Sequence, residues 1–160
     1  MKTVGGQVFA GCTSLEKVNV NLNNKNYTSE NGIWYDKNKT KIILYPYNKK
    51  DSAYTTPTSL KELCNGYVGS YGMLLDNSNL KTVTIEKNVT KIDDYAIGFV
   101  FDFDNYKINK AKDFTVKGYR GTVAESYAKK NSFNFVALDK TLQTPSISKL
   151  ENTSGGIKIS

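Results

Sequence analysis

Residues Phe9 to Val20 read F-A-G-C-T-S-L-E-K-V-N-V, and their apolar spacing returns downstream with different residues. The segment L-K-T-V-T-I, from Leu80 to Ile85, carries apolar side chains at the same relative positions as L-E-K-V-N-V, which begins at Leu15. Such recurrence is typical of stacked supersecondary units, because one short unit cannot bury its apolar face alone. The stretch therefore predicts a solenoid, an architecture that favours binding by a surface over catalysis in a pocket.

A second match supports the repeat. The segment P-T-S-L-K-E-L, at 57–63, aligns with K-N-V-T-K-I, at 87–92. Leu60 then matches Val89 and Leu63 matches Ile92, both 29 positions apart. Each unit is expected to form a short strand whose alternate side chains point inward, followed by a turn.

A third match extends the array toward the C-terminus. Val83 and Ile85 recur as Phe114 and Val116, both shifted by 31 positions. The unequal shifts indicate that the connections between units vary in length while the inward-facing apolar positions are kept.

Residues 21–56 have a different pattern and are expected to be an insertion. Asn31 and Gly32 are the preferred residues of a two-residue hairpin turn, and they lead into a strand at 33–36. A second strand is expected at 40–45 and should end at Pro46, because proline cannot donate to a strand ladder.

Two further segments look like irregular loops that interrupt the repeat. The first, 65–79, contains three glycines, and the second covers 99–112. Near the C-terminus, the segment from Ile147 to Ile159 is expected to contain a first strand, a turn and half of a second strand.

The segment 114–138 is expected to cap the array. Thr122 can act as the N-cap of a short helix, with Glu125 as its capping-box partner. Asn131 is expected to end the helix in a left-handed conformation. The helix should cover the open end of the stack, because the last apolar layer must be closed.

Composition limits the classes of partner. The 160 residues are 39% hydrophobic and 23% charged, with a formal net charge of +7. Apart from Arg120 the positive charges are all lysines, and they are scattered, whereas nucleic-acid interfaces favour clustered basic groups and arginine. No apolar run approaches the roughly 18 residues of a membrane-spanning helix. We therefore expect neither a nucleic-acid partner nor a transmembrane segment.

Little in the sequence supports catalysis or metal binding. The chain has no histidine, which removes Ser-His and Cys-His machinery. Cys12 and Cys64 are expected to be buried free thiols. Acidic side chains at 93–94 or at 102–105 could serve glycoside hydrolysis, and Asp102 and Asp104 could bind calcium, but neighbouring acids on loops are usually solvated. No cofactor, metal or catalytic residue is predicted.

Aromatic residues give the strongest indication of a binding site. The chain has eleven tyrosines and one tryptophan. The candidate ligand-binding residues, all in the insertion, are Trp34, Tyr45, Tyr47 and Tyr54. If Ile33 and Tyr35 pack inward, alternation exposes Trp34, where it could stack on a sugar or anchor a protein interface. Alternatively, the hairpin folds back and buries Trp34 against the first coil.

These motifs together resemble the BspA-type leucine-rich repeat, also called the Treponema pallidum-type repeat. In that family an A-F, a C or N, an S-L and a V-x-V or V-x-I recur, as in Phe9 to Val20. The insertion at 24–46 is similar to the Y-x-S-x-N-G-I-x-Y segment of the family's bacterial surface proteins. Residues 114–135 resemble its terminal cap, and the last residues resemble the opening of a fibronectin type III-like module. The resemblance covers about residues 5–138 plus the tail.

The resemblance implies an α/β leucine-rich-repeat solenoid, a right-handed coil of short parallel strands with a hairpin insertion and a capping helix. It assigns residues 1–138 to the repeat domain and 139–160 to a linker and a truncated fibronectin type III-like segment. It also implies a secreted or wall-attached, non-enzymatic adhesion protein that binds proteins or glycans on host or microbial surfaces. The alternative is a carbohydrate-binding module of a larger surface glycan-processing protein.

Overall fold

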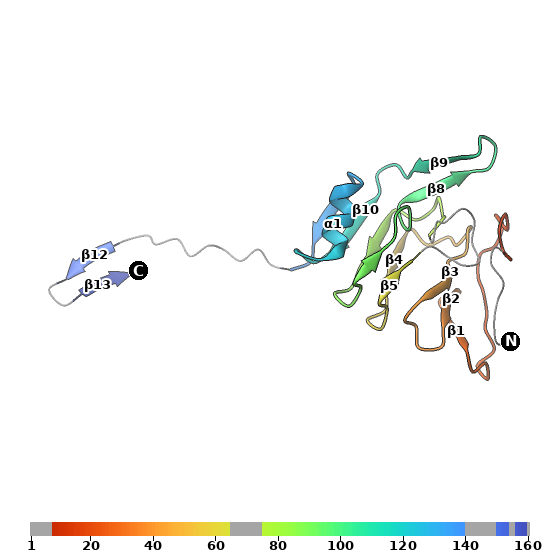
Figure 1. Cartoon of the computed structure of the whole chain (residues 1–160), viewed down its shortest axis with the longest axis horizontal. Coiled ribbons are helices and arrows are strands. Elements are labelled where there is room, and N and C mark those ends of the chain that lie inside the picture. The colour runs from red at the N-terminus through yellow and green to blue at the C-terminus, as the bar shows by residue number, and fades with distance from the viewer. Residues whose placement is uncertain (1–7, 65–74, 140–149, 154–155, 160) are drawn as a thin grey trace.

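The computed structural model describes residues 8–64, 75–139, 150–153 and 156–159 of the chain. These residues form a repeat-like α/β fold of short strands and one α-helix, drawn in Figure 1. Within these ranges no helix has the length and apolar character needed to cross a bilayer.

The larger of two parallel sheets has the strand order β11-β10-β6-β4. Its strands are β4 (Ala53–Thr55), β6 (Thr82–Thr84), β10 (Thr115–Gly118) and β11 (Asn134–Ala137). Across β4, β6 and β10, the residues Tyr54, Val83 and Val116 are paired in register, and all three side chains are buried. Alternate strand residues thus line one wall of the core.

A smaller parallel sheet pairs β5 (Glu62–Leu63) with β7 (Lys91–Ile92). Leu63 pairs with Ile92, so the predicted 29-residue match is confirmed at this pair. An isolated parallel bridge pairs Lys41 with Glu62, so a third chain segment lies beside β5 in this sheet.

The turns before β5 and β7 repeat the same hydrogen bond. The Leu60 amide donates to the Pro57 carbonyl over 2.9 Å, and the Val89 amide donates to the Glu86 carbonyl over 3.1 Å. Leu60 and Val89 are both buried. Turn and strand therefore recur together in two consecutive units of the chain.

The predicted match of Val83 to Phe114 is wrong by two residues. Val83 pairs with Val116 and Thr82 with Thr115, a separation of 33 positions. Side chains alternate along a strand with a period of two, so a slip of two residues leaves the same residues facing the core. Phe114 is accordingly also buried, just ahead of β10.

The insertion forms an antiparallel sheet of β1 (Tyr27–Glu30), β2 (Ile33–Asp36) and β3 (Ile42–Leu44), in that order. Asn31 and Gly32 join β1 to β2 with φ of 51° and 77°, and two positive φ values are typical of a type I′ turn. The predicted turn is confirmed, as are strands within 33–36 and 40–45. The strand β1 is an addition.

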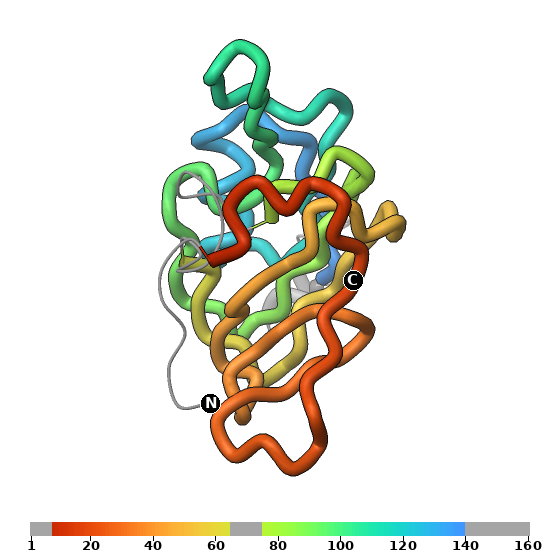
Figure 2. The backbone as a smooth tube through the Cα atoms, turned by 90° about the vertical axis from the view of Figure 1, so that its right-hand side faces the viewer, coloured from red at the N-terminus to blue at the C-terminus, as the bar shows by residue number. Residues whose placement is uncertain are grey.

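The stretch from Phe9 to Val20 forms no strand, contrary to the prediction for its V-N-V segment. Figure 2 shows this segment (red) running over the insertion strands (orange). The Val18 amide donates to the Gly32 carbonyl, and the Val20 amide donates to Ser29 Oγ. These amides bond to a turn and to a side chain, so no ladder forms, while the apolar side chains pack against the insertion sheet.

The segment 99–112, predicted to be an irregular loop, contains an antiparallel hairpin. Its strands are β8 (Phe99–Asp102) and β9 (Lys107–Lys110), which pair over four residues each. Figures 1 and 2 both show this hairpin reaching past the parallel strands.

The predicted cap contains one helix, α1 (Val123–Lys130), with Thr122 at its N-cap position. The Thr122 side chain makes no capping hydrogen bond, contrary to the capping-box prediction. The Glu125 carboxylate instead accepts from the Gly121 amide over 2.7 Å. Glu125 therefore bonds the backbone amide of Gly121, whereas the capping box predicts a bond to the amide of Thr122.

At the other end of α1, Asn131 has φ of −97°, and the left-handed residue is Ser132, with φ of 52°. The Asn131 side chain instead donates to the Tyr127 carbonyl. The Tyr127 hydroxyl donates to the Ile97 carbonyl over 2.7 Å, which fixes the buried face of the helix to the loop after β7. The buried side chains of α1 are Ala124, Tyr127 and Ala128.

Near the C-terminus, β12 (Leu150–Thr153) and β13 (Gly156–Ile159) form an antiparallel pair. The two predicted strands are therefore present, residues 147–149 and the predicted turn residues 154–155 lie outside the described residues, and membership of a fibronectin type III-like module stays a prediction. Of the irregular loop predicted at 65–79, residues 65–74 lie outside the described residues.

A buried amide at Asn77 connects the insertion to the parallel coils. Its Nδ2 donates to the Pro46 and Lys49 carbonyls over 2.9 and 3.0 Å. Its Oδ1 accepts from the amides of Asn79 and Leu80. All hydrogen-bonding positions of this buried side chain are thus satisfied.

We expect Asn77→Ala to lower the free energy of unfolding by roughly 2–4 kcal/mol, because it leaves several buried backbone groups without partners. Urea unfolding followed by circular dichroism measures the change. The exposed neighbour Ser78 provides the control, and Ser78→Ala should have little effect. Equal stability of the two variants would contradict the assigned role of Asn77.

Candidate functional site

Trp34, the first candidate ligand-binding residue, is only 3% exposed. Its ring makes edge contacts with Phe9 and Tyr27 at centroid distances of 6.0 and 5.3 Å. Ile33 and Tyr35 face the main core on the opposite side of β2, so the predicted alternation is confirmed. Of the two alternatives, the structure supports burial of Trp34, because the N-terminal segment covers the second face of the insertion sheet.

The other three candidates, Tyr45, Tyr47 and Tyr54, are also buried. Tyr45 and Tyr54 pack edge to face in the main core, with ring centroids 5.5 Å apart. Tyr47 packs with Trp34 and Leu44 on the other side of the sheet. All four candidate residues are therefore buried and none of them forms an exposed stacking platform, while a role of these residues in ligand binding stays a prediction.

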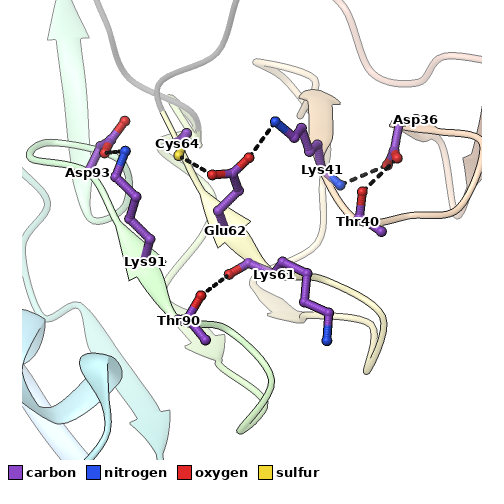
Figure 3. A network of polar contacts seen from close by, with 9 residues as sticks. All are labelled: Asp36, Thr40, Lys41, Lys61, Glu62, Cys64, Thr90, Lys91 and Asp93. Atoms are coloured by element: carbon purple, nitrogen blue, oxygen red, sulfur yellow. Dashed lines mark hydrogen bonds and ion pairs between the residues drawn. The ribbon is translucent and has the colours of Figure 1, made fainter.

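Charged side chains follow the smaller parallel sheet, as Figure 3 shows. Glu62 lies between Lys41 and Lys91, which are its partners on the two neighbouring chain segments. The Lys41 ammonium is 2.5 Å from the Glu62 carboxylate. The Lys41 hydrogen bond lowers the pKa of Glu62. Lys91 pairs with Asp93 over 2.9 Å. Alternating charge on adjacent strands favours this register, because opposite charges then face each other.

A cavity of about 380 Å³ adjoins this charged row, and Cys64 forms part of its wall. The Cys64 thiol donates to Glu62 over 3.2 Å. Burial, followed by that hydrogen bond, raises the pKa of Cys64 to about 11, so the thiol is protonated near neutral pH and is a poor nucleophile. Cys12 and Cys64 are free thiols as predicted, but Cys12 is exposed and Cys64 only half-buried.

The acidic residues considered for catalysis or calcium binding have local structural roles. Asp102 Oδ1 accepts from the amides of Asp104 and Asn105, and Oδ2 accepts from the Asn105 side chain. These bonds, chiefly that from the Asn105 side chain, lower the pKa of Asp102. Asp102 therefore stabilises the turn between β8 and β9. Asp94, in a different loop, pairs with Lys130 of α1.

Exposed aromatic side chains lie instead on and beside the β8–β9 hairpin. Tyr106, in the turn just before β9, is 78% exposed, and Tyr95, in the loop before β8, is 50% exposed. Edge contacts connect Phe101 to Tyr106 at 6.3 Å and to Phe103 at 5.0 Å. The sequence carries this signal as F-V-F-D-F-D-N-Y at 99–106, but without the hairpin pairing it reads as an irregular loop.

Both exposed tyrosines have left-handed backbone conformations, with φ of 62° at Tyr95 and 50° at Tyr106. Bulky residues seldom adopt this region because the Cβ atom approaches the backbone. Such strain persists only where surrounding structure holds it, and it concentrates at functional sites. Tyr95 and Tyr106 thus combine a left-handed backbone conformation with an exposed side chain.

Asp76, which the sequence did not indicate, holds the hairpin to the body of the protein. Its Oδ1 accepts from the Phe101 amide in β8 over 3.0 Å. Its Oδ2 is buried and accepts no hydrogen bond from the described part of the chain. Burial raises the pKa of Asp76 from its ordinary value of 3.8 to about 6.

Comparisons with known proteins gave no matching family model and no matching curated protein. Among solved structures, a leucine-rich repeat protein from Eubacterium ventriosum aligns with a TM-score of 0.42 and 25% identity, covering 76% of this chain and 33% of that one. The pneumococcal vaccine antigen PcpA aligns with a TM-score of 0.32 and 17% identity, covering 80% and 51%. The chain thus spans about a third to a half of the length of these proteins.

We expect Asp76→Asn to raise the free energy of unfolding near neutral pH by roughly 1–2 kcal/mol. The folded-state pKa is the higher one, so the unfolded carboxyl loses its proton first, and the wild-type loses stability as pH rises from 3.8 to about 6. The asparagine keeps the acceptor for Phe101 and removes the buried charge. Urea unfolding across this pH range should show the two proteins converging in acid. A constant difference would contradict the assignment, and Asp104→Asn, at an exposed site, is the control.

Proposed function

We propose that the chain is a non-enzymatic binding segment of a secreted or wall-attached bacterial protein that adheres to surface components of a host or of other microbes. The observation that carries this proposal is the pair of exposed aromatic side chains on and beside the β8–β9 hairpin, Tyr106 (78% exposed) and Tyr95 (50% exposed). Exposed tyrosine rings can bury a large apolar area on contact with a partner and are common anchors of protein interfaces.

We further propose that the parallel coils belong to a right-handed leucine-rich-repeat solenoid of the BspA type, followed by a fibronectin type III-like segment. The 29-residue register of β5 and β7, with the same turn before each strand, supports the repeat. In this arrangement the stack supplies a rigid scaffold, and the hairpin that interrupts it supplies the contact surface.

The non-enzymatic part of the proposal is supported by the chemistry of the candidate groups. The chain has no histidine to act as a base near neutral pH. The Cys64 thiol is held in its protonated form, and Asp102 is engaged by its own turn. Turnover of a glycan by the purified chain, abolished by Asp102→Asn, would contradict this part.

A second candidate function is that of a carbohydrate-binding module in a larger glycan-processing surface protein. It is favoured by a separate polar cavity of about 300 Å³ beside β4, which Glu30, Lys49, Asp51 and Tyr54 help to line. The two functions use different surfaces and can be tested independently.

We expect Tyr106→Ala to weaken adhesion to the proteins or cells that the wild-type chain binds by roughly 1–2 kcal/mol, about five- to thirtyfold in Kd, because it removes the largest exposed ring of the hairpin. Biolayer interferometry on immobilised collagen, laminin and fibrinogen, with whole-cell adhesion in parallel, measures the effect. Tyr95→Ala should reduce binding as well.

Leu22→Ala is the matched control, because Leu22 is also a large exposed side chain but lies in the insertion. Its adhesion should equal that of the wild-type. Unchanged adhesion in both tyrosine variants, or an equal loss in Leu22→Ala, would contradict binding through the hairpin.

A further inference from the structure

The cavity beside β4 lies where the insertion sheet meets the larger parallel sheet. We call it the junction cavity. Its volume is about 300 Å³, at the lower end of the range of ligand pockets. It is lined by Glu30, Asn31, Ile33, Tyr35, Lys49, Asp51, Ala53, Tyr54 and Thr55. A space of this size suits one small ring better than an extended polymer.

The charges around the junction cavity are neutralised in pairs. Glu30 pairs with Lys39 over 3.0 Å, and Asp51 forms an ion pair with Lys49, whose side chain is mostly buried. Charges that are paired in this way leave little net charge to attract an ion. Its carboxylates and ammonium groups still offer strong acceptors and donors, so it favours an uncharged ligand with many hydrogen-bonding groups.

Buried phenol hydroxyls contribute to the same region. The hydroxyls of Tyr35 and Tyr54, both in the cavity wall, are hydrogen-bonded over 3.1 Å. The neighbouring Tyr45 hydroxyl is buried and has no hydrogen-bond partner in the described part of the chain. Burial raises the pKa of Tyr45, and the charge of Asp51 raises it further, so this hydroxyl lies within the field of the cavity's acid.

The free edge of β4 adds backbone groups. Ser52 and Thr56 direct their backbone hydrogen bonds toward β6, at the Thr82 amide and the Thr84 carbonyl. In a parallel ladder alternate residues bond to opposite sides, so the backbone groups of Ala53 and Thr55 point away from β6, and both residues line the cavity.

We propose that the junction cavity binds a neutral saccharide unit, with the Asp51 carboxylate and the Lys49 ammonium bonding its hydroxyls and with Ile33, Ala53 and the tyrosine rings contacting its C–H surface. A sugar ring has closely spaced hydroxyls that both donate and accept, as this wall requires, together with an apolar face that packs on aliphatic and aromatic side chains. The inference rests on the second candidate function and does not depend on the hairpin.

The test is a ¹⁵N-HSQC titration of the full chain with methyl glycosides of glucose, galactose, mannose and N-acetylglucosamine. Glucuronate and a capped alanine tripeptide serve as the anionic and peptide comparators. We expect at least one neutral glycoside to shift the amides of Asn31, Asp51 and Thr55. Asp51→Asn should weaken that binding about tenfold, since it removes a charged acceptor from an exposed position.

Asp94→Asn is the matched control, because Asp94 is an exposed aspartate in an ion pair with Lys130 on the cap. It should bind the glycoside like the wild-type, as should Tyr106→Ala, so failure of the hairpin function and failure of this site are distinguishable. Lys49→Gln should also weaken binding. The proposal is overturned if no neutral glycoside shifts these amides, if Asp51→Asn binds equally well, or if glucuronate or the peptide binds more tightly.

Discussion

Stacking of two coils in a 29-residue register is the constraint on which the rest of the structure depends. Leu60 and Leu63 of one coil lie beside Val89 and Ile92 of the next, and the first three of these side chains are buried. Burial of each such side chain contributes roughly 1.5–3 kcal/mol, which neither coil gains alone. Because the skeleton is fixed by these few positions, the connections between them can vary, and functional features can be built there.

The two hairpins that interrupt the coils use their aromatic residues in opposite ways. The insertion sheet is covered on both faces, with Tyr35 in the main core and Trp34 beneath the N-terminal segment. The β8–β9 hairpin keeps Tyr106 in solvent and is attached to the body through the Asp76–Phe101 hydrogen bond. The insertion thus extends the core, whereas the second hairpin keeps an aromatic side chain exposed to solvent.

The repeat, the type I′ turn and the cap helix were predictable, because each depends on local spacing or on residues with specific backbone preferences. The 33-residue register of Val83 and Val116 was not predictable from the sequence. A slip of two residues between the paired strands leaves the same side chains facing the core. Burial of Trp34 depends on which segment covers the outer face of β2, and that is a tertiary contact. Cys12 and Asn77 hold the same place in equivalent turns, yet Asn77 is buried and bonded to the Pro46 and Lys49 carbonyls, whereas Cys12 is exposed, and the sequence spacing does not reveal this difference.

The central claim is that Trp34 and the buried tyrosines of the insertion pack in the core and form no exposed stacking surface. Trp34 is the only tryptophan of the chain, so its fluorescence reports on this claim directly. We predict a blue-shifted emission and weak quenching by acrylamide in the native protein, both lost in urea. Emission and quenching like those of free tryptophan in the folded protein would contradict the account, because Trp34 would then be exposed and available to a ligand.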